Sequence, residues 1–192
     1  MQILRHNVST ITLIRHGPPA VSIRQRVAGY EFRGFIERYD AAKIKQQAIP
    51  PAKVAHVIAQ ADQVFASHHP RATHTAKLLG ASEIHLVDPC FREIEFPVDF
   101  THRFRLSALT WTAIALTLWR LGHSAQYESF LQAKQRARNA TDILEQEAYK
   151  GSVALVAHGG INRLIAKELR QRGWQGPRLP HSRHWGCTTY RL

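Results

Sequence analysis

Residues 11–17 read Ile-Thr-Leu-Ile-Arg-His-Gly, a short apolar run that ends in an arginine, a histidine and a glycine. A similar pattern returns at residues 153–160, which read Val-Ala-Leu-Val-Ala-His-Gly-Gly. Each run is typical of a buried strand followed by a glycine turn. Ligands of α/β proteins bind beyond the carboxyl ends of parallel strands, so we expect His16 and His158 to share one pocket. Two histidines that converge in this way suggest group-transfer chemistry.

Strand-like runs alternate with segments of helical periodicity along the rest of the chain. This alternation predicts an α/β fold with a mainly parallel central sheet. The expected strands are residues 11–15, 63–67, 83–87, 153–157 and 188–192, and the expected helices include residues 52–60, 71–79, 103–121, 127–147 and 162–171. The most apolar stretch, residues 106–119, is shorter than the roughly 20 residues needed to span a bilayer, so we expect a buried helix there.

The length of 192 residues predicts a single domain over residues 1–192, large enough for a sheet with helices on both faces. Between the first two strands, apolar residues at helical spacing are followed by the helix-breaking pair Pro50-Pro51. We therefore expect residues 17–51 to be an insertion that covers the pocket.

The chain is strongly basic, with 26 Lys and Arg against 14 Asp and Glu and a formal charge of +12. Its arginines are dispersed, which favours attraction to anions over a dedicated nucleic-acid surface. The two cysteines, Cys90 and Cys187, have no metal-ligand or redox spacing and indicate a reducing compartment. Residues 1–9 lack the apolar run of a signal peptide. We expect a cytoplasmic protein without a membrane segment.

Four motifs occur in a characteristic order along the chain. They are Leu-Ile-Arg-His-Gly at 13–17, Ser-His-His-Pro-Arg-Ala-Thr-His-Thr-Ala at 67–76, Phe-Arg-Glu-Ile-Glu-Phe at 91–96 and Ala-His-Gly-Gly-Ile-Asn-Arg at 157–163. By these motifs the sequence resembles the histidine phosphatase superfamily, also called the phosphoglycerate-mutase-like family. The resemblance runs from residue 11 to about residue 170. It implies a three-layer α/β/α sandwich and a metal-independent mechanism without a cofactor.

The resemblance also implies catalytic roles for five residues. His16 matches the nucleophile, whose neutral imidazole attacks phosphorus to form a phosphohistidine. Arg15 and Arg71 match the arginines that clamp the phosphate, a task suited to the planar guanidinium fork. His158 matches the second histidine, which donates a hydrogen bond to the phosphoryl group. Glu93 matches the carboxylate that protonates the departing alkoxide and later activates water.

Further substrate-binding residues are expected around these five. Gly17 and Gly159 permit close approach of the backbone to the substrate. Ser22 stands where mutase-type relatives have an asparagine that touches the phosphate, and its hydroxyl could replace that donor. Glu95 competes with Glu93 for the acid role, although its spacing fits the family pattern less well. Pro97 stands where the family usually has a glycine after the Glu93 motif. This change falls near the expected substrate entrance, so substrate specificity is the property that the resemblance predicts least.

Several histidines fall outside the assigned roles, and they raise the question of a metal site. No pair has a helical i, i+4 spacing with a carboxylate partner, so no metal is expected. Two of the set, His69 and His102, could line the pocket mouth and attract an anion when protonated. The further histidines considered are His68, His69, His74, His102, His181 and His184.

The sequence therefore predicts a phosphatase that hydrolyses a small phosphomonoester through a phosphohistidine on His16. One alternative is a phosphoglycerate-type mutase, and another is a phosphatase of phosphohistidine or phosphoproteins. A third, from a different class, is a non-catalytic protein that binds anions or nucleic acid, although no basic tract interleaved with aromatic residues is present. The natural substrate is left open. An apolar stripe on residues 106–119 could also support a homodimer.

Overall fold

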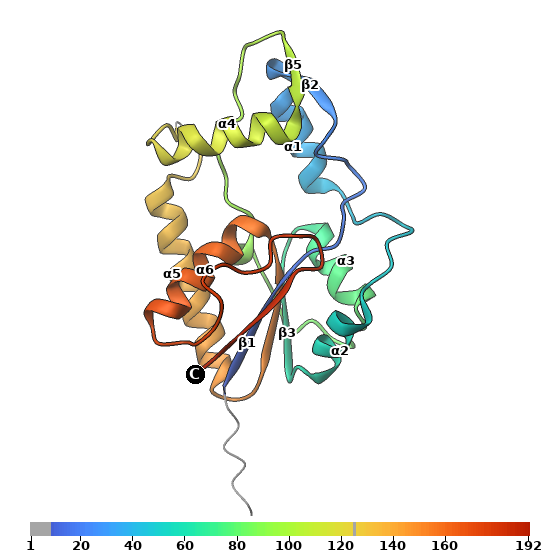
Figure 1. The fold of residues 1–192 in the computed structure, drawn as a ribbon, viewed down its shortest axis with the longest axis vertical. Helices are drawn as coiled ribbons and strands as arrows, with labels where there is room; N and C mark the ends of the chain where they lie inside the picture. Colours follow the sequence, from blue (N-terminus) through green and yellow to red (C-terminus); the bar gives the residue numbers. More distant parts are fainter. Residues whose placement is uncertain (1–8, 125) are drawn as a thin grey trace, which may run out of the picture.

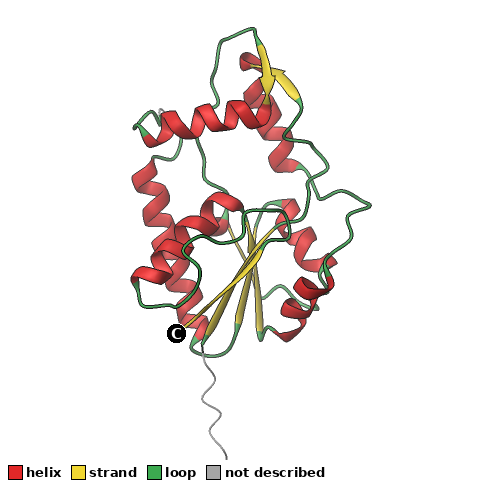
Figure 2. Ribbon diagram, in the orientation of Figure 1, coloured by secondary structure: helices red, strands yellow, loops and turns green. Residues whose placement is uncertain are grey.

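A computed structural model describes residues 9–124 and 126–192, in which helices flank a five-stranded sheet (Figures 1 and 2). The expectation that the chain has no signal peptide rests on residues 1–9, of which residues 1–8 lie outside the described residues. The strands are β1 (Thr10–Arg15), β2 (Arg26–Ala28), β3 (Gln63–Ser67), β4 (Leu86–Asp88), β5 (Arg105–Ser107), β6 (Val153–Ala157) and β7 (Cys187–Arg191). The α-helices are α1 (Phe32–Ala41), α2 (Ala52–Gln60), α3 (Pro70–Leu78), α4 (Ala108–Arg120), α5 (Phe130–Ala148) and α6 (Gly159–Gln171).

The main sheet has the strand order β4-β3-β6-β1-β7. The neighbours from β4 to β1 are parallel, and only the edge strand β7 runs antiparallel to β1. The predicted α/β fold with a mainly parallel sheet is therefore confirmed. Since β1 and β6 lie side by side, the two histidine motifs leave the sheet at the same edge.

The side chains of β1 alternate between the two helical layers, as strand geometry requires. Ile11 and Leu13 pack in one buried cluster with residues of α5 and α6. Ile14 belongs to a second cluster, which contains residues of α2 and α3. Figure 1 shows α5 and α6 on one side of the sheet and α2 and α3 on the other. The apolar run that opens the first motif thus anchors both layers.

A third buried cluster lies apart from the sheet, in a substructure that we call the cap. The cap consists of residues 26–41 (β2, a 3₁₀ turn and α1) and residues 105–120 (β5 and α4) (Figure 1). Its core includes Phe32 and Phe35 of α1 and Trp111 of α4. Only the first half falls within residues 17–51, so two segments far apart in sequence build the cover.

The second half of the cap differs from the expectation of one buried helix. Residues 105–107 form β5, which pairs antiparallel with β2, and α4 begins only after Ser107, whose side chain accepts a hydrogen bond from Thr110 N. Strands of three residues are too short to reveal an alternation in sequence. Only one face of α4 is buried, because Leu109 remains 52% exposed and Ile114 36% exposed. The expected strand at 83–87 is likewise shorter, at Leu86–Asp88.

The apolar stretch at residues 106–119 also raises the question of membrane insertion. Within residues 9–124 and 126–192, no helix combines the length and apolar character needed to cross a bilayer.

Candidate functional site

The register of β1 and β6 brings the two motif histidines together. Arg15 pairs with Ala157, and the next residue, His16, donates its backbone N–H to the Ala157 carbonyl at 3.0 Å. The rings of His16 and His158 consequently lie with their centroids 5.1 Å apart. Parallel pairing of the strands therefore places these two imidazoles at one point of the sheet edge.

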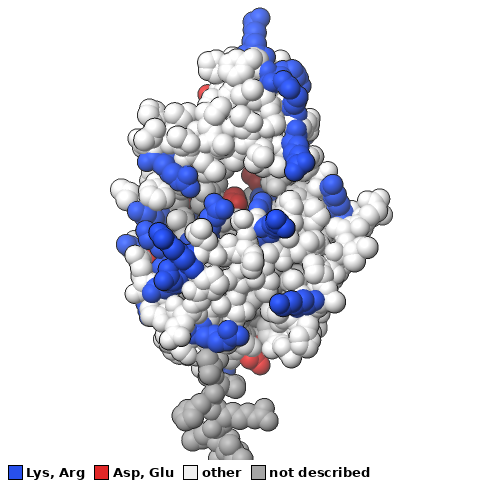
Figure 3. All heavy atoms as spheres, viewed as in Figure 1, with Lys and Arg blue, Asp and Glu red and all other residues white. Residues whose placement is uncertain are grey.

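A cavity of about 610 Å³ lies above this edge, beneath the cap. Figure 3 shows the hollow near the middle of the molecule, with carboxylate atoms inside it and basic side chains around it. Residues from the sheet edge, from both halves of the cap, and from α5 and α6 line it. The polar groups nearest the motifs are Arg15, His16, Asp40, His69, Arg71, Glu93 and Ser182.

The hydrogen bonds of His16 determine which ring nitrogen is available for reaction. His16 Nδ1 lies 2.7 Å from the carbonyl oxygen of Gly17. Because a carbonyl can only accept, Nδ1 carries the proton and Nε2 of the neutral ring keeps its lone pair. Arg71 Nε donates to this Nε2 at 3.3 Å. The side chain is 2% exposed, so the lone pair is held in a desolvated position.

The surroundings of both histidines favour the uncharged ring. Burial, followed by the positive charge of Arg71, holds the pKa of His16 well below its usual value. The pKa of His158 is lowered in the same way, by burial first and then by Arg71 and His16. Burial and Arg15 also lower the pKa of His184, to about 4, and its ring centroid lies 5.5 Å from that of His16. Near pH 7 the site therefore combines neutral imidazoles with permanently charged guanidinium groups.

Arg71 lies in the first turn of α3 and is 1% exposed. Its Nη1 donates to the carbonyls of Tyr39 and Asp40 at 3.1 and 3.2 Å, and its Nη2 donates to the Asp40 carboxylate at 3.0 Å. The guanidinium also lies 5.0 Å from the centroid of the Tyr39 ring. An incoming anion must compete with Asp40 for Nη2.

Arg15 closes β1 beside the α6 N-terminus. Its Nη1 donates to the backbone carbonyl of Ser182, while its Nε is buried and has no partner among the described residues. A Cβ at Gly159 would lie 3.4 Å from the Arg15 Cζ. The guanidinium therefore lies next to the first residue of α6, at a distance that a side chain there would also tolerate.

His158 is fully buried behind the cavity wall. Its Nε2 lies 2.8 Å from Ser67 Oγ, and its Nδ1 is buried without a partner in the described part of the chain. Its ring centroid lies 5.1 Å from that of His69, which does line the cavity. An unsatisfied buried nitrogen between two other imidazoles is a candidate ligand for an anion.

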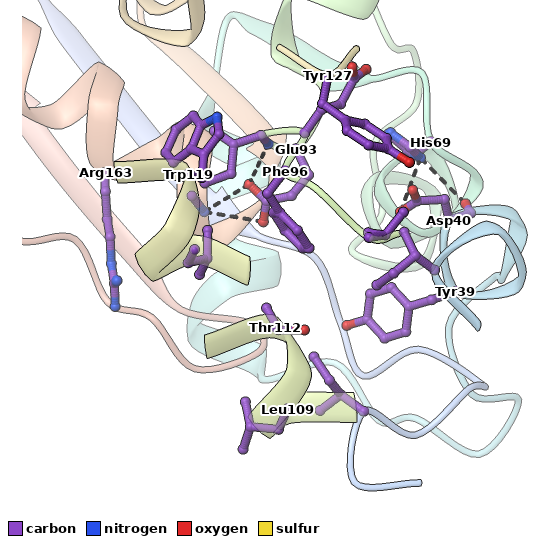
Figure 4. A pocket seen from close by; sticks show the side chains of 18 of the residues that line it. Tyr39, Asp40, His69, Glu93, Phe96, Leu109, Thr112, Trp119, Tyr127 and Arg163 are labelled. Carbon is purple, nitrogen blue, oxygen red and sulfur yellow. Dashed lines mark hydrogen bonds and ion pairs between the residues drawn. The ribbon is translucent and has the colours of Figure 1, made fainter. Parts of the chain in front are cut away.

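Glu93 reaches the cavity from an irregular segment and rests on the N-terminus of α6 (Figure 4). Its Oε1 accepts from the backbone N–H groups of Gly160 at 2.9 Å and of Ile161 and Ile94 at 3.0 Å. These bonds use N–H groups that a helix start leaves unsatisfied. A Cβ at Gly160 would lie 2.5 Å from this oxygen, so only glycine allows the approach.

The segment that carries Glu93 is fixed from behind by Arg136 of α5. Arg136 Nη1 donates to the carbonyls of Cys90 and Arg92, each at 2.9 Å, and Nε and Nη2 pair with the buried Glu128 at 2.7 and 2.6 Å. Because a chain without regular structure has few bonds of its own, this guanidinium supplies the rigidity that places Glu93.

Three residues considered from sequence, Ser22, Gly17 and His102, are absent from the cavity wall, and a fourth, Glu95, lines it but is partly exposed. Ser22 is exposed and absent from the cavity wall; its hydroxyl accepts from Arg24 N at 3.3 Å, so the expected phosphate donor is not in place. Gly17 donates its N–H to Thr75 Oγ1 at 2.9 Å and faces Trp185. His102 stacks on Phe104 in the cap. Glu95 lines the cavity but is 49% exposed and pairs with Arg92.

The structure adds three side chains that the sequence did not identify. They are Ser67 beside His158, Asp40 on Arg71, and His184 beside His16. Ser67 stood inside a quoted motif, and the serine at its start was the available signal. Asp40 lies in a stretch without any motif, and His184 was one of several unassigned histidines. No local feature of the sequence distinguishes Asp40 or His184 from the other aspartates and histidines of the chain.

Metal binding was considered because of the many histidines. Across the described ranges, 9–124 and 126–192, no group of three or more His, Cys, Asp or Glu side chains is arranged to hold a metal ion.

The lowered histidine pKa values predict a pH dependence of stability. Below the unfolded-state pKa of about 6.5, the unfolded chain takes up protons that His16 and His158 in the folded chain do not. The free energy of unfolding should therefore fall as pH drops from about 6.5 towards 5, by about 1.4 kcal/mol per pH unit for each such histidine. Thermal denaturation at several pH values measures this, and His158→Gln should flatten the slope. A melting temperature that is constant or rises on acidification contradicts it.

Comparisons with known proteins bear on the fold and the family of this chain. None of the curated proteins compared with the sequence matches it. Several solved structures share the fold. The protein of open reading frame Rv3214 from Mycobacterium tuberculosis is 18% identical at a TM-score of 0.65, with 98% of this chain and 95% of that chain covered. A phosphoserine phosphatase from Entamoeba histolytica is 18% identical at a TM-score of 0.62, and the match covers 95% of this chain and 93% of that chain. The α-ribazole phosphatase from Shigella flexneri is 20% identical at a TM-score of 0.58, and the match covers 83% of this chain and 79% of that chain.

The sequence itself matches the family model of the histidine phosphatase superfamily (branch 1) over residues 44–190. The match begins after Arg15 and His16 and includes Arg71, Glu93 and His158. Since it covers more than half of the chain and three of the four motifs that meet at the cavity, this chain belongs to the histidine phosphatase superfamily.

Proposed function

We propose that this protein is a phosphatase that hydrolyses a small phosphomonoester through a phosphohistidine on His16. The carrying observation is the hydrogen bond from His16 Nδ1 to the Gly17 carbonyl, which leaves Nε2 with a lone pair at the cavity. Two buried nitrogens, Arg15 Nε and His158 Nδ1, have no partner in the described residues. The Arg15 N–H is suited to a phosphate oxygen, and His158 Nδ1 is suited to one in the tautomer in which the Ser67 hydroxyl donates to Nε2. Reaction in a reducing cytoplasm belongs to the same proposal, and both cysteines are free.

In the first step, His16 Nε2 attacks phosphorus and the bond from phosphorus to the ester oxygen breaks. Glu93, in its protonated form, gives its proton to the departing alkoxide, so a neutral alcohol leaves. Arg15 and Arg71 balance the charge of the transferring phosphoryl group. The N–H of Nδ1 stays on the Gly17 carbonyl, which keeps the phosphorylated ring in position.

In the second step, the Glu93 carboxylate accepts a proton from water, and the resulting hydroxide oxygen attacks the phosphohistidine. The nitrogen–phosphorus bond breaks, inorganic phosphate leaves, and both His16 and Glu93 return to their starting protonation states. Glu93 is suited to both steps because one oxygen is anchored on α6 while the side chain lines the cavity.

Entry of the phosphate requires a change at Arg71, whose Nη2 is bonded to Asp40. A dianionic phosphate carries more charge than a carboxylate and offers more acceptor oxygens, so it should displace Asp40 from this nitrogen. The Asp40 carboxylate is 39% exposed and can turn towards solvent.

The test is to trap the intermediate. Protein quenched during turnover of a ³²P-labelled ester, with a chelator present, should carry label that is stable to alkali, labile to acid and located on His16 by mass spectrometry. No label in a rapidly quenched, actively hydrolysing sample excludes the covalent mechanism. Quantitative transfer of the label to an added phosphoglycerate, with little phosphate released, identifies the alternative mutase.

A further inference from the structure

The cavity beneath the cap has two chemically different parts. The part near the sheet edge is lined by charged and polar groups, including Arg15, His16 and Glu93. The wall formed by α4 supplies Leu109, Thr112, Leu116 and Trp119 at the spacing i, i+3, i+7 and i+10, which places them on one side of the helix. Figure 4 shows Leu109 and Thr112 together with Phe96 in the same cavity as Glu93. The phosphate site therefore opens directly onto an apolar wall.

This wall is not explained by the packing of the cap. Ala108, Trp111 and Ala115 already anchor α4 in the cap core through a neighbouring face. Leu109, on the cavity side, is 52% exposed. A surface helix usually directs polar residues away from its core, so a second apolar face is suited to an apolar ligand.

Three polar side chains of the wall, Thr112, Trp119 and Tyr127, are already bonded within the protein. The Thr112 hydroxyl donates to the Ala108 carbonyl at 2.8 Å, and the Trp119 indole N–H donates to the Glu128 carbonyl at 2.6 Å. Tyr127 donates its hydroxyl to Asp99 at 2.9 Å. These groups leave few hydrogen bonds for the hydroxyls of a sugar. Burying unpaired hydroxyls against this wall would be unfavourable.

We infer that the preferred substrate is a phosphomonoester of an alcohol with an extended apolar body, such as an alkyl chain, which lies along α4 while the phosphate sits at His16. This inference rests on the proposed function and adds the substrate class. The volume of about 610 Å³ is within the range of small-molecule sites and exceeds the space that a phosphate alone requires. Charged residues also line this cavity, among them Glu37, Arg120 and Arg163, and these three are exposed to solvent.

The test uses primary n-alkyl phosphates from ethyl to octyl. Every member of the series has the same kind of alkoxide as its leaving group. Differences in kcat/KM therefore report contacts between the alkyl chain of the substrate and the protein. We expect kcat/KM to rise two- to fourfold for each added methylene until the apolar wall is covered. A kcat/KM that is constant or falls along the series, with ethyl phosphate hydrolysed in a His16-dependent way, overturns the substrate class and leaves the proposed function standing.

Variants of residues on α4 test whether the alkyl chain of the substrate lies along this helix. Leu109→Gln and Leu116→Gln should lower the octyl-to-ethyl ratio of kcat/KM at least fivefold. Ile114→Gln is the matched control, because Ile114 is 36% exposed on the same helix and does not line the cavity. An unchanged ratio in the two wall variants overturns the placement along α4.

Binding of phosphonates separates this inference from the proposed function. Ethyl- and octylphosphonate resist hydrolysis, so calorimetry measures their affinities even if the protein hydrolyses no ester at all. Octylphosphonate binding at least tenfold more tightly than ethylphosphonate, with the difference reduced in Leu109→Gln, supports the apolar subsite. Equal affinities overturn it.

Discussion

Replacement of His16 by alanine is expected to lower kcat for p-nitrophenyl phosphate by about 10⁴-fold or more. Loss of a nucleophile removes the covalent route entirely, and the remaining groups can only bind the substrate and stabilise charge. The assay is release of nitrophenolate from pH 5 to pH 8 in the presence of a chelator. Because burial and the charge of Arg71 hold the pKa of His16 well below its usual value, the wild-type rate should not fall steeply just below pH 6.5 through protonation of His16.

His56 offers a matched control for this substitution. It is an exposed histidine on α2 and does not line the cavity, so His56→Ala should retain activity within about twofold. The thermal midpoint of both variants at pH 7 shows whether the fold is preserved. Retention of more than a tenth of the wild-type rate by a folded His16→Ala protein would be incompatible with a nucleophilic role for His16.

Replacement of Glu93 by glutamine is expected to lower kcat/KM for an alkyl phosphate by 10² to 10⁴-fold, the usual contribution of a general acid. The amide preserves the size of the side chain and one oxygen that can accept from the N–H groups of Gly160 and Ile161. p-Nitrophenolate leaves without a proton, so formation of the phosphohistidine from p-nitrophenyl phosphate should be largely spared.

The second step still requires a base, so the Glu93→Gln variant should release one equivalent of nitrophenol rapidly and then turn over slowly. Stopped-flow absorbance measures this burst, with Glu95→Gln as the control because Glu95 is half exposed and paired with Arg92. Equal losses for alkyl and aryl esters without a burst would show that Glu93 serves the structure of α6 rather than proton transfer.

The two histidine motifs could be interpreted from sequence because their geometry is local. Each histidine directly follows its strand, and chain connectivity places it at the strand end whatever the rest of the molecule does. The parallel pairing of β1 with β6 then brings His16 and His158 together. Arg71 was identifiable for the same reason, since it lies in the first turn of the helix that follows β3.

The cap could not be derived in this way. Its two halves are about 60 residues apart in the chain, and β2 and β5 consist of three residues each, so neither has a pattern of its own. The amphipathic character of α4 was also hidden, because both of its apolar faces contribute to one continuous hydrophobic stretch. Which face covers the cap core and which borders the cavity depends on long-range packing.

Local sequence thus determined the α/β class, the strands that carry the motifs and the placement of His16 and His158 directly after these strands, since these depend on periodicity and on neighbours in the chain. The tertiary structure alone decided the pairing of Arg71 with Asp40, the exclusion of Ser22 from the cavity and the apolar wall of the cavity. These features arise from contacts between segments far apart in sequence, whose energies depend on burial and orientation that no local pattern encodes.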